Sequence, residues 1–431
     1  SATSSAATTA SNAAALSAAV PTPGGTVVAT SNSALAGAAA PGVATPASKA
    51  PLLHVRTDVL DLDISLAGGE LVRSDLLAYP LHKDDPNLPV RLFDDSSEDK
   101  LYVLQSGLAG GGSAAAPDHR AIWQAPTTDW KLANGAAELR VPLSWSDGNG
   151  LTVIKTFVFK RGSYAIDLVY DVHNSGAAPR SLASYLQFLR HWVHPSRSYF
   201  DVETYSFKGP AIYDGHKYRR LNVEKAEDAG FAQSVTNGWL ASMQHHFVSA
   251  IVPHADQAYQ YQLRVSGNDY LLGATGPTVS VAPGGSAQFR ETLFTGPKLQ
   301  SQLAATGPEL DRTADYGSLT IIARPLFMTL KWVHAAVGNW GWAIIIVTAL
   351  IKLLFYPLSQ ASGRSMARMR AVAPRMKQIQ ETYKDDREKL GRAMMELYKR
   401  EKINPVAGCL PMLVQIPFFI SFYWVLLESV E

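Results

Sequence analysis

The stretch WGWAIIIVTALIKLLFYPL, residues 340–358, decides how the chain is organised, because it is apolar and long. Extended back to Val333 it covers about 26 residues, and at ~1.5 Å per residue it can cross a hydrocarbon core of roughly 30 Å with some tilt. We therefore expect a transmembrane helix over 334–358. Lys352 is its only formal charge apart from the ionisable His334. A lysine at the centre of such a helix costs on the order of 2.5–3.5 kcal/mol, so either something offsets that cost or the lysine lies near an edge.

The segment that follows, residues 359–402, is basic. It holds 12 basic and six acidic side chains, whereas residues 1–351 hold 26 basic and 29 acidic ones, although the whole chain has a net charge of only +2. Short basic loops beside membrane spans stay in the cytoplasm. We therefore expect residues 359–402 to be cytoplasmic and residues 1–333 to lie outside the cytoplasm.

Further helices flank this region. Residues 316–333 place apolar side chains near one helical face and predict an amphipathic helix in the membrane interface. Residues 362–384 and 386–401 predict an antiparallel pair of polar helices, a hairpin within 359–402, with methionine-rich apolar stripes. Residues 405–428 predict a second transmembrane helix, since prolines are tolerated in membrane spans when neighbours satisfy the freed carbonyls.

The region 52–312 has a different pattern, with period two. LDLDISL (60–66), LTVIKTFVFK (151–160) and YAIDLVYDV (164–172) alternate apolar and polar residues between glycine-rich turns. Many short strands at such spacing predict a β-sandwich. With the helices that follow, the expected fold is an all-β domain outside the cytoplasm, joined to an α-helical membrane region with a cytoplasmic hairpin.

The two ends and the single cysteine set further expectations. Residues 1–50 are almost entirely small or polar, with Lys49 the only charge, and predict a disordered tether. Cys409 is the only cysteine, so no intrachain disulfide forms. The chain starts at Ser1 and ends with an apolar run, so we expect either a removed N-terminal segment or a fragment of a longer protein.

Lys352 is the leading candidate site residue, and two interpretations stay open. Its side chain can snorkel to the headgroups, or it can face a hydrated cavity, as charges inside spans usually do. Thr348 and Tyr356 lie four residues to either side on the same face, which favours the cavity. Gln415, a lone amide in the second span, fits the same cavity or ordinary helix–helix hydrogen bonding.

The remaining polar motifs give weaker signals. The basic hairpin suits a solvated face, anionic lipid or an adaptable methionine-lined protein surface, and its interleaved acids argue against nucleic acid. HWVH (191–194) and HH (245–246) match no standard zinc spacing. No nucleophile-elbow, zinc-protease or phosphate-loop motif occurs, so we expect no catalytic residues, no metal and no cofactor.

Three of these segments resemble the YidC membrane protein insertase family. They are DYGSLTIIARPLF (315–327), GNWGWAIIIVTALIKLLFYPLS (338–359) and NPVAGCLPMLVQIPFF (404–419). The resemblance runs from about residue 52 to the end and implies a periplasmic β-supersandwich related to galactose mutarotase. It also implies a five-helix membrane core enclosing a groove that opens to the cytoplasm and the lipid, so three further spans should follow Glu431.

The resemblance also assigns roles to residues. The family's groove carries one basic residue, usually arginine, which here is Lys352. Lysine keeps the positive charge but lacks the bidentate fork of arginine. Thr348 matches the groove threonine and Gln415 the polar residue of the next helix, with Tyr356 beside them. The hairpin, with Met366, Met369, Met376 and Met394, matches the part thought to receive substrates.

The sequence thus predicts an insertase and chaperone of the bacterial inner membrane, multi-pass and not an enzyme. Its expected partners are nascent membrane proteins, the Sec translocon, the ribosome and anionic membrane lipid. The alternative from another class is a membrane-anchored carbohydrate-binding or mutarotase-like enzyme, which would need a sugar-binding cleft in 52–310. A solute transporter would need more spans and polar sites at mid-membrane.

Overall fold

The structure is a computed structural model that describes residues 12–21, 50–82, 84–110, 115–194, 206–314, 319–384, 386–401 and 405–430, with only the backbone of 405–411. The chain divides into two compact units, one ending at Ala314 and one spanning Asp315–Ser429. Each unit is described by itself.

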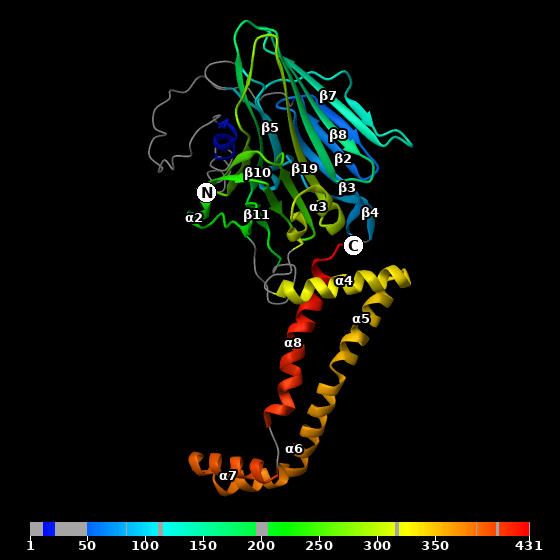
Figure 1. The fold of residues 1–431 in the computed structure, drawn as a ribbon, viewed down its shortest axis with the longest axis vertical. Coiled ribbons are helices and arrows are strands. Elements are labelled where there is room, and N and C mark those ends of the chain that lie inside the picture. Colours follow the sequence, from blue (N-terminus) through cyan, green and yellow to red (C-terminus); the bar gives the residue numbers. More distant parts are fainter. Residues whose placement is uncertain are drawn as a thin grey trace. The chain divides into compact units, whose positions relative to one another are not determined.

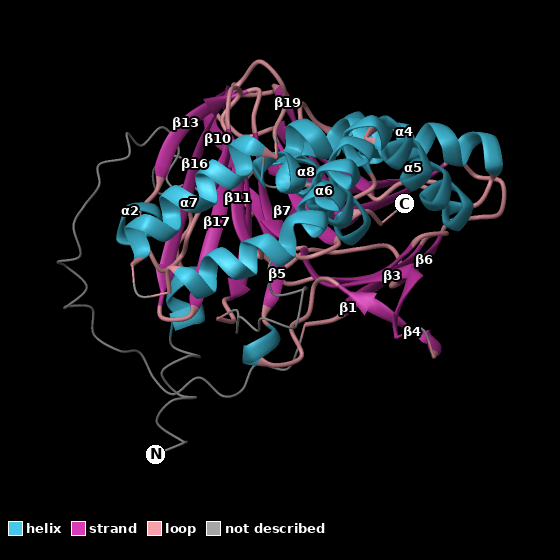
Figure 2. Cartoon of the chain, turned by 90° about the horizontal axis from the view of Figure 1, so that it is seen from below, coloured by secondary structure: helices cyan, strands magenta, loops and turns pink. Residues whose placement is uncertain are grey.

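The first unit is built from two sheets, which confirms the predicted β-sandwich (Figures 1 and 2). One has eleven strands in the order β13-β16-β17-β10-β5-β3-β2-β1-β6, with β18 paired to β10 and β4 to β3; the other has eight, in the order β12-β11-β14-β15-β19-β9-β8-β7. The strands are β1 (Leu52–Arg56), β2 (Leu60–Ser65), β3 (Glu70–His82), β4 (Asp85–Arg91), β5 (Tyr102–Gly110), β6 (Asp129–Lys131), β7 (Glu138–Ser146), β8 (Leu151–Lys160), β9 (Ala165–Asn174), β10 (Arg180–His191), β11 (Gly209–Tyr213), β12 (Tyr218–Arg220), β13 (Ala232–Thr236), β14 (Trp239–Met243), β15 (Phe247–Val252), β16 (Ala258–Ser266), β17 (Asp269–Thr275), β18 (Val279–Val281) and β19 (Ser286–Pro297). Short helical elements of this unit are η1 (Glu98–Lys100), α2 (Ala226–Ala229), α3 (Gln300–Thr306) and η3 (Leu310–Thr313).

The sandwich has one main core between its sheets. Alternate side chains of each strand point inward, as in β8, where Leu151, Val153, Phe157 and Phe159 are buried. Lys155 occupies the inward position between them and is fully buried. Its ammonium group donates to the carbonyl oxygens of Gly68, Gly69 and Ser106 at 3.1, 2.8 and 3.3 Å.

The other side of the eleven-stranded sheet, its outer face, is irregular at β3. Asp63 of β2 pairs with Arg73, and the next residue, Ile64, pairs with Leu71, so Val72 is an extra residue in β3. This is a β-bulge, which lets two successive side chains leave the sheet on the same side. Val72 lies outside the main core in a small separate cluster, and Arg73 lies in a charged network.

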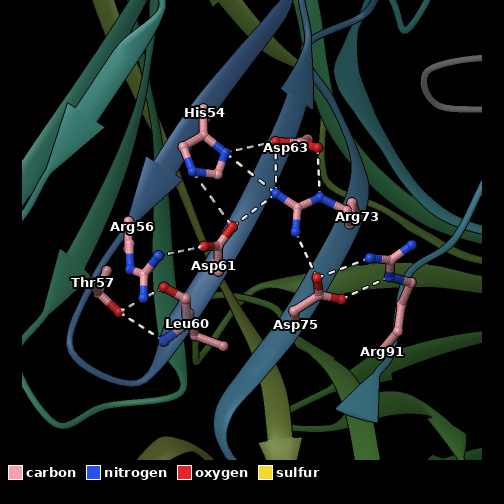
Figure 3. Close-up of polar contacts among 9 residues, drawn as sticks. All are labelled: His54, Arg56, Thr57, Leu60, Asp61, Asp63, Arg73, Asp75 and Arg91. Carbon is pink, nitrogen blue, oxygen red and sulfur yellow. Dashed lines mark hydrogen bonds and ion pairs between the residues drawn. The ribbon is translucent and has the colours of Figure 1, made fainter. Parts of the chain in front are cut away.

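The charged network joins β1 to β4 (Figure 3). The Arg73 guanidinium donates to Asp63, Asp61 and Asp75 at 2.5, 2.7 and 2.6 Å, and Arg91 donates to Asp75 at 2.7 Å. Burial acts to raise the pKa of Asp63, but hydrogen bonds from Arg73 and His54 outweigh it and hold that pKa below its usual value. Because acids and bases balance, we interpret the network as structural.

The N-terminal segment differs in part from the expected disordered tether. Residues 12–17 are helical, and Leu16 is buried against the sandwich. Contacts of Asn12, Leu16 and Ser17 with the sandwich hold this short helix in place. The rest of the predicted tether, except Ala50 and residues 18–21, lies outside the described residues.

The second unit is helical in its described residues, which confirms the predicted helical C-terminal region. Its helices are α4 (Thr320–Val337), α5 (Trp340–Leu354), α6 (Tyr356–Thr382), α7 (Arg387–Arg400) and α8 (Pro405–Glu428). Its core is formed by buried apolar residues of α4, α5 and α8, namely Ala323, Phe327, Leu330, Val333, Ala343, Val347, Ile351, Phe422 and Val425.

The helix predicted over 334–358 is divided among three elements. Gly338, at φ +67°, ends α4, and the Asn339 side chain caps α5 by accepting a hydrogen bond from the Trp342 amide at 3.2 Å. Pro357 has no N–H to continue the ladder, and α5 and α6 meet at Phe355 with a bend of 59°. Among the described residues no single helix has the length and apolarity of a membrane span; the bent pair has them when taken together, and Met412–Glu428 is apolar but shorter.

Candidate functional site

The candidate groove residues lie on and beside α5. This helix packs one side into the helical core through Ala343, Val347 and Ile351, at the i, i+4 spacing of a single helix face. Its other sides carry exposed apolar residues, including Ile345 and Leu353. The helix therefore has a wide apolar surface that is exposed in the structure.

Lys352 lies on this exposed surface, in the last turn of α5. The structure gives its ammonium group no hydrogen bond and no ion pair with any described residue. The C-terminal end of a helix carries partial negative charge, so this position suits a cation. The charge is therefore available to an external group.

The other three predicted groove residues differ in their exposure and their hydrogen bonds. The Thr348 hydroxyl donates to the Ile344 carbonyl of its own helix at 2.7 Å, and Tyr356 is exposed at the start of α6. Gln415 of α8 donates from Nε2 to the Ser359 hydroxyl of α6 at 3.2 Å. Ser359 is seven residues beyond Lys352, or about 10 Å along a straight helix.

A ring contact supports the position of α8 beside the bend. Phe418, three residues after Gln415, packs edge-on against Phe355 with ring centroids 4.9 Å apart. The structure thus brings Gln415 to the junction of α5 and α6, but among the described residues it forms no direct bond from Gln415 to Lys352 or Thr348. Ser359 was not among the predicted groove residues, although its spacing of two helical turns from Lys352 is a signal for it.

The hairpin predicted to receive substrates is formed by α6 and α7. The Arg375 guanidinium of α6 pairs with Glu401, just beyond the end of α7, and Val372 and Leu397 are buried. Of the four predicted methionines, Met366 is exposed at 48%, while Met369, Met376 and Met394 are partly buried. Met395 is exposed at 60% and was not among the predicted residues, because the predicted apolar stripe passes through its neighbour Met394.

The sandwich histidines have ordinary partners. His191 contacts Asp269 at 2.8 Å, His194 contacts Glu224 at 2.8 Å, and the rings of His245 and His246 stack at 3.8 Å. The described part of the chain contains no group of three or more His, Cys, Asp or Glu side chains that fits a metal ion.

Comparison with known families covers nearly the whole chain after the N-terminal segment. A family model of the YidC periplasmic domain matches residues 52–329, and a model of the 60Kd inner membrane protein family matches residues 332–431. A protein of Thioalkalivibrio sulfidiphilus named membrane protein insertase YidC is 45% identical over 389 residues, which is 88% of this chain and 69% of that protein. Proteins of the same name from Pseudomonas putida strain GB-1 and Nitrosococcus oceani are each 43% identical, over 90% and 88% of this chain and 70% and 69% of their own lengths.

Solved structures give only distant similarity. A galactose mutarotase related enzyme from Lactobacillus acidophilus is 8% identical with a TM-score of 0.38, covering 57% of this chain and 97% of that one. A galactose mutarotase-like protein from Lactobacillus casei is 8% identical with a TM-score of 0.37, covering 57% of this chain and 99% of that one. Scores this low bear on neither the fold nor the function of the chain.

Proposed function

The chain belongs to the YidC family of membrane protein insertases, and from that premise we propose that Lys352 makes the insertion path hydrophilic. The family confirms the predicted role as an insertase rather than an enzyme, and it makes the chain an inner-membrane protein with a periplasmic domain. Nascent membrane proteins are accordingly its substrates.

The observation that carries the proposal is the exposed ammonium group at the end of an apolar helix, with no ion pair to any residue that the structure describes. An inserting helix often brings acidic flanking residues, which must cross an apolar layer. A lysine and a carboxylate 4 Å apart attract by about 4 kcal/mol at an effective dielectric constant of 20. This is comparable with the roughly 2.5–3.5 kcal/mol needed to place one charged side chain at mid-membrane, so one fixed cation can offset much of the barrier.

The neighbouring polar groups extend this path in our proposal. Thr348, Lys352, Tyr356 and the Gln415–Ser359 pair follow one another along α5, the bend and α6. Together they would hydrate one side of an otherwise apolar helix. Thr348 and Tyr356 would line the path, and Gln415 would hold α8 beside it.

We propose the membrane arrangement from the charge pattern. Residues 1–333 are periplasmic, with 52–312 as the sandwich domain and 316–333 as an interfacial helix. Residues 334–358 and 405–428 cross the membrane, and 359–402 are cytoplasmic. The exposed basic side chains of α6 and α7, such as Arg368 and Arg400, support contact with anionic lipid or a ribosome, and the chain works alone or beside the Sec translocon.

The test uses Lys352 variants in cells depleted of their own insertase. With a substrate that translocates an acidic tail, we expect Lys352→Met to slow insertion by roughly tenfold, the equivalent of ~1.4 kcal/mol in the barrier, and Lys352→Arg to stay near the unmodified rate. The rate is read from protease protection of the translocated tail.

A matched substrate in which the tail carboxylates are replaced by amides is the control. It should be inserted at similar rates by all three proteins, because it offers Lys352 no opposite charge. If Lys352→Met inserts the acidic substrate as fast as the unmodified chain, the lysine only snorkels to the headgroups and the proposal is wrong.

A further inference from the structure

We infer that the outer face of the eleven-stranded sheet contains a peptide-binding groove whose occupant is the chain's own segment Asn12–Pro21. We call this segment the docked segment; it is the dark blue helix of Figure 1 with the four residues that follow it. Three kinds of contact, along and at both ends of the short helix, carry the inference.

The apolar anchor of the docked segment is Leu16. It is 8% exposed and packs in a cluster with Val72, Val103, Leu189 and Leu271, which come from β3, β5, β10 and β17. None of these four residues belongs to the main core. Four strands thus build a separate apolar receptacle, and a single leucine fills it.

A polar receptacle lies beside it and binds Ser17. Gln105 donates from Nε2 to the Ser17 hydroxyl at 2.8 Å, and the Ser17 carbonyl oxygen lies 2.5 Å from His119 Nε2. The Tyr185 hydroxyl accepts from the His119 amide and lies 2.6 Å from Nδ1, so it can donate there and leave Nε2–H for Ser17.

Residues of the sandwich hold this polar receptacle in place. Gln187 donates to the Gln105 side-chain oxygen at 2.9 Å, and the Gln105 amide also reaches Glu70 at 2.9 Å. Gln105, Gln187 and His119 are all buried. Because these bonds do not involve the docked segment, the donors are already oriented before the segment binds, which favours a specific contact.

The helix also has a contact at its start. The Ser266 hydroxyl donates to Asn12 Oδ1 at 3.3 Å, in the turn between β16 and β17. Gly267 in this turn has φ +58°, and a Cβ there would lie 2.3 Å from the Asn12 amide nitrogen. The turn therefore needs glycine both for its backbone and for the approach of Asn12.

These contacts define what the groove accepts: a short helix of small residues with one leucine, followed directly by serine. They also fix where the start of the docked segment lies on the sandwich. Asn12 lies against the end of β16, and not at the start of β1 near Pro51. The N-terminal segment is therefore attached to the domain at two places.

Disulfide trapping in the full chain tests the inference. Cys409 is the only native cysteine, so a Cys409→Ser background carries only the introduced pair. We expect Asn12→Cys with Ser266→Cys to crosslink under mild oxidation at least tenfold faster than a control pair, Asn12→Cys with Ser144→Cys on β7 of the other sheet. Equal rates for the two pairs would overturn the inference.

A second set of variants tests the anchor in the same assay. Leu16→Asp should slow crosslinking of the 12–266 pair at least tenfold, and Leu16→Ala should slow it less. Ala15→Asp, at an exposed position of the same turn, should leave the rate within twofold. Since Leu16 lies outside the main core, the sandwich should keep its tryptophan fluorescence in all three. A rate unaffected by Leu16→Asp would contradict the groove.

Discussion

At the scale of the residue, Lys155 is the most unusual side chain of the sandwich. Burial lowers its pKa to about 7, although the Glu70 carboxylate acts in the opposite direction. In the protonated form its three N–H donors match three carbonyl oxygens. The alternation of 151–160 predicts that residue 155 points inward, but it also predicts an apolar side chain there. The carbonyl partners come from residues 68, 69 and 106, and no local pattern in the sequence links them to β8.

Lys155 leads to a prediction about pH. A lysine whose pKa is lower in the folded chain favours folding above its unfolded pKa of about 10.5, and this contribution disappears as the pH falls through about 7. The free energy of unfolding of the sandwich should therefore rise by on the order of 2 kcal/mol between pH 7.5 and 9.5. Lys155→Met should lack this rise and should be less stable throughout, because the buried carbonyls around the Lys155 amine lose its N–H donors.

Urea unfolding followed by fluorescence of the buried Trp123 and Trp239 measures the effect. Lys131→Met, which changes an exposed lysine of β6, is the control and should keep the rise. A rise of the same size in Lys155→Met would show that other groups cause it.

At the scale of the element, the helices after residue 319 show which features a sequence determines. Apolar composition and the charge change at 359 predict the segments, while Gly338, Asn339 and Pro357 decide where the backbone breaks. Each of these residues is a known local signal for the end or start of a helix. A hydropathy average over 334–358 detects none of the three. Long-range contacts such as Gln415 with Ser359 depend on how α8 packs against α6, which composition does not specify.

The hairpin of α6 and α7 gives a prediction at this scale. If it receives substrates, a photo-crosslinking amino acid at the exposed positions Met366 and Met395 should capture nascent membrane proteins. The same group at Val372, which is buried, should capture several-fold less. Flexible thioether side chains suit a surface that binds many apolar sequences. Equal capture at all three positions, or none at 366 and 395, would contradict a role of this surface in receiving substrates.

At the scale of the whole molecule, the sandwich and the helical unit have separate cores. The main core uses only residues between Leu53 and Leu310, and the helical core only residues between Ala323 and Val425. Strand patterns predict the sandwich class, but not the pairing: the parallel contact of β1 with β6 joins segments more than 70 residues apart. The family resemblance, rather than periodicity, identified the function.

Separate cores predict separate folding. A fragment of residues 12–314 should fold in water without the helical unit, with a urea midpoint within about 0.5 M of the sandwich transition in the full chain. Near-ultraviolet circular dichroism and fluorescence of Trp123 and Trp239 would follow it. A fragment that lacks fixed tertiary structure would show that the sandwich depends on residues after 314.

The extra residue in β3 links two features that otherwise have nothing in common. Val72 helps to hold Leu16, while Arg73, one position on, donates hydrogen bonds to three aspartates. In a regular strand these neighbours would face opposite sides, and only one of them could stay on the solvent side of the sheet. Shortening the strand by one residue here would therefore send either the valine or the guanidinium towards the interior, so that N-terminal anchorage and charge balance would be disturbed by the same deletion.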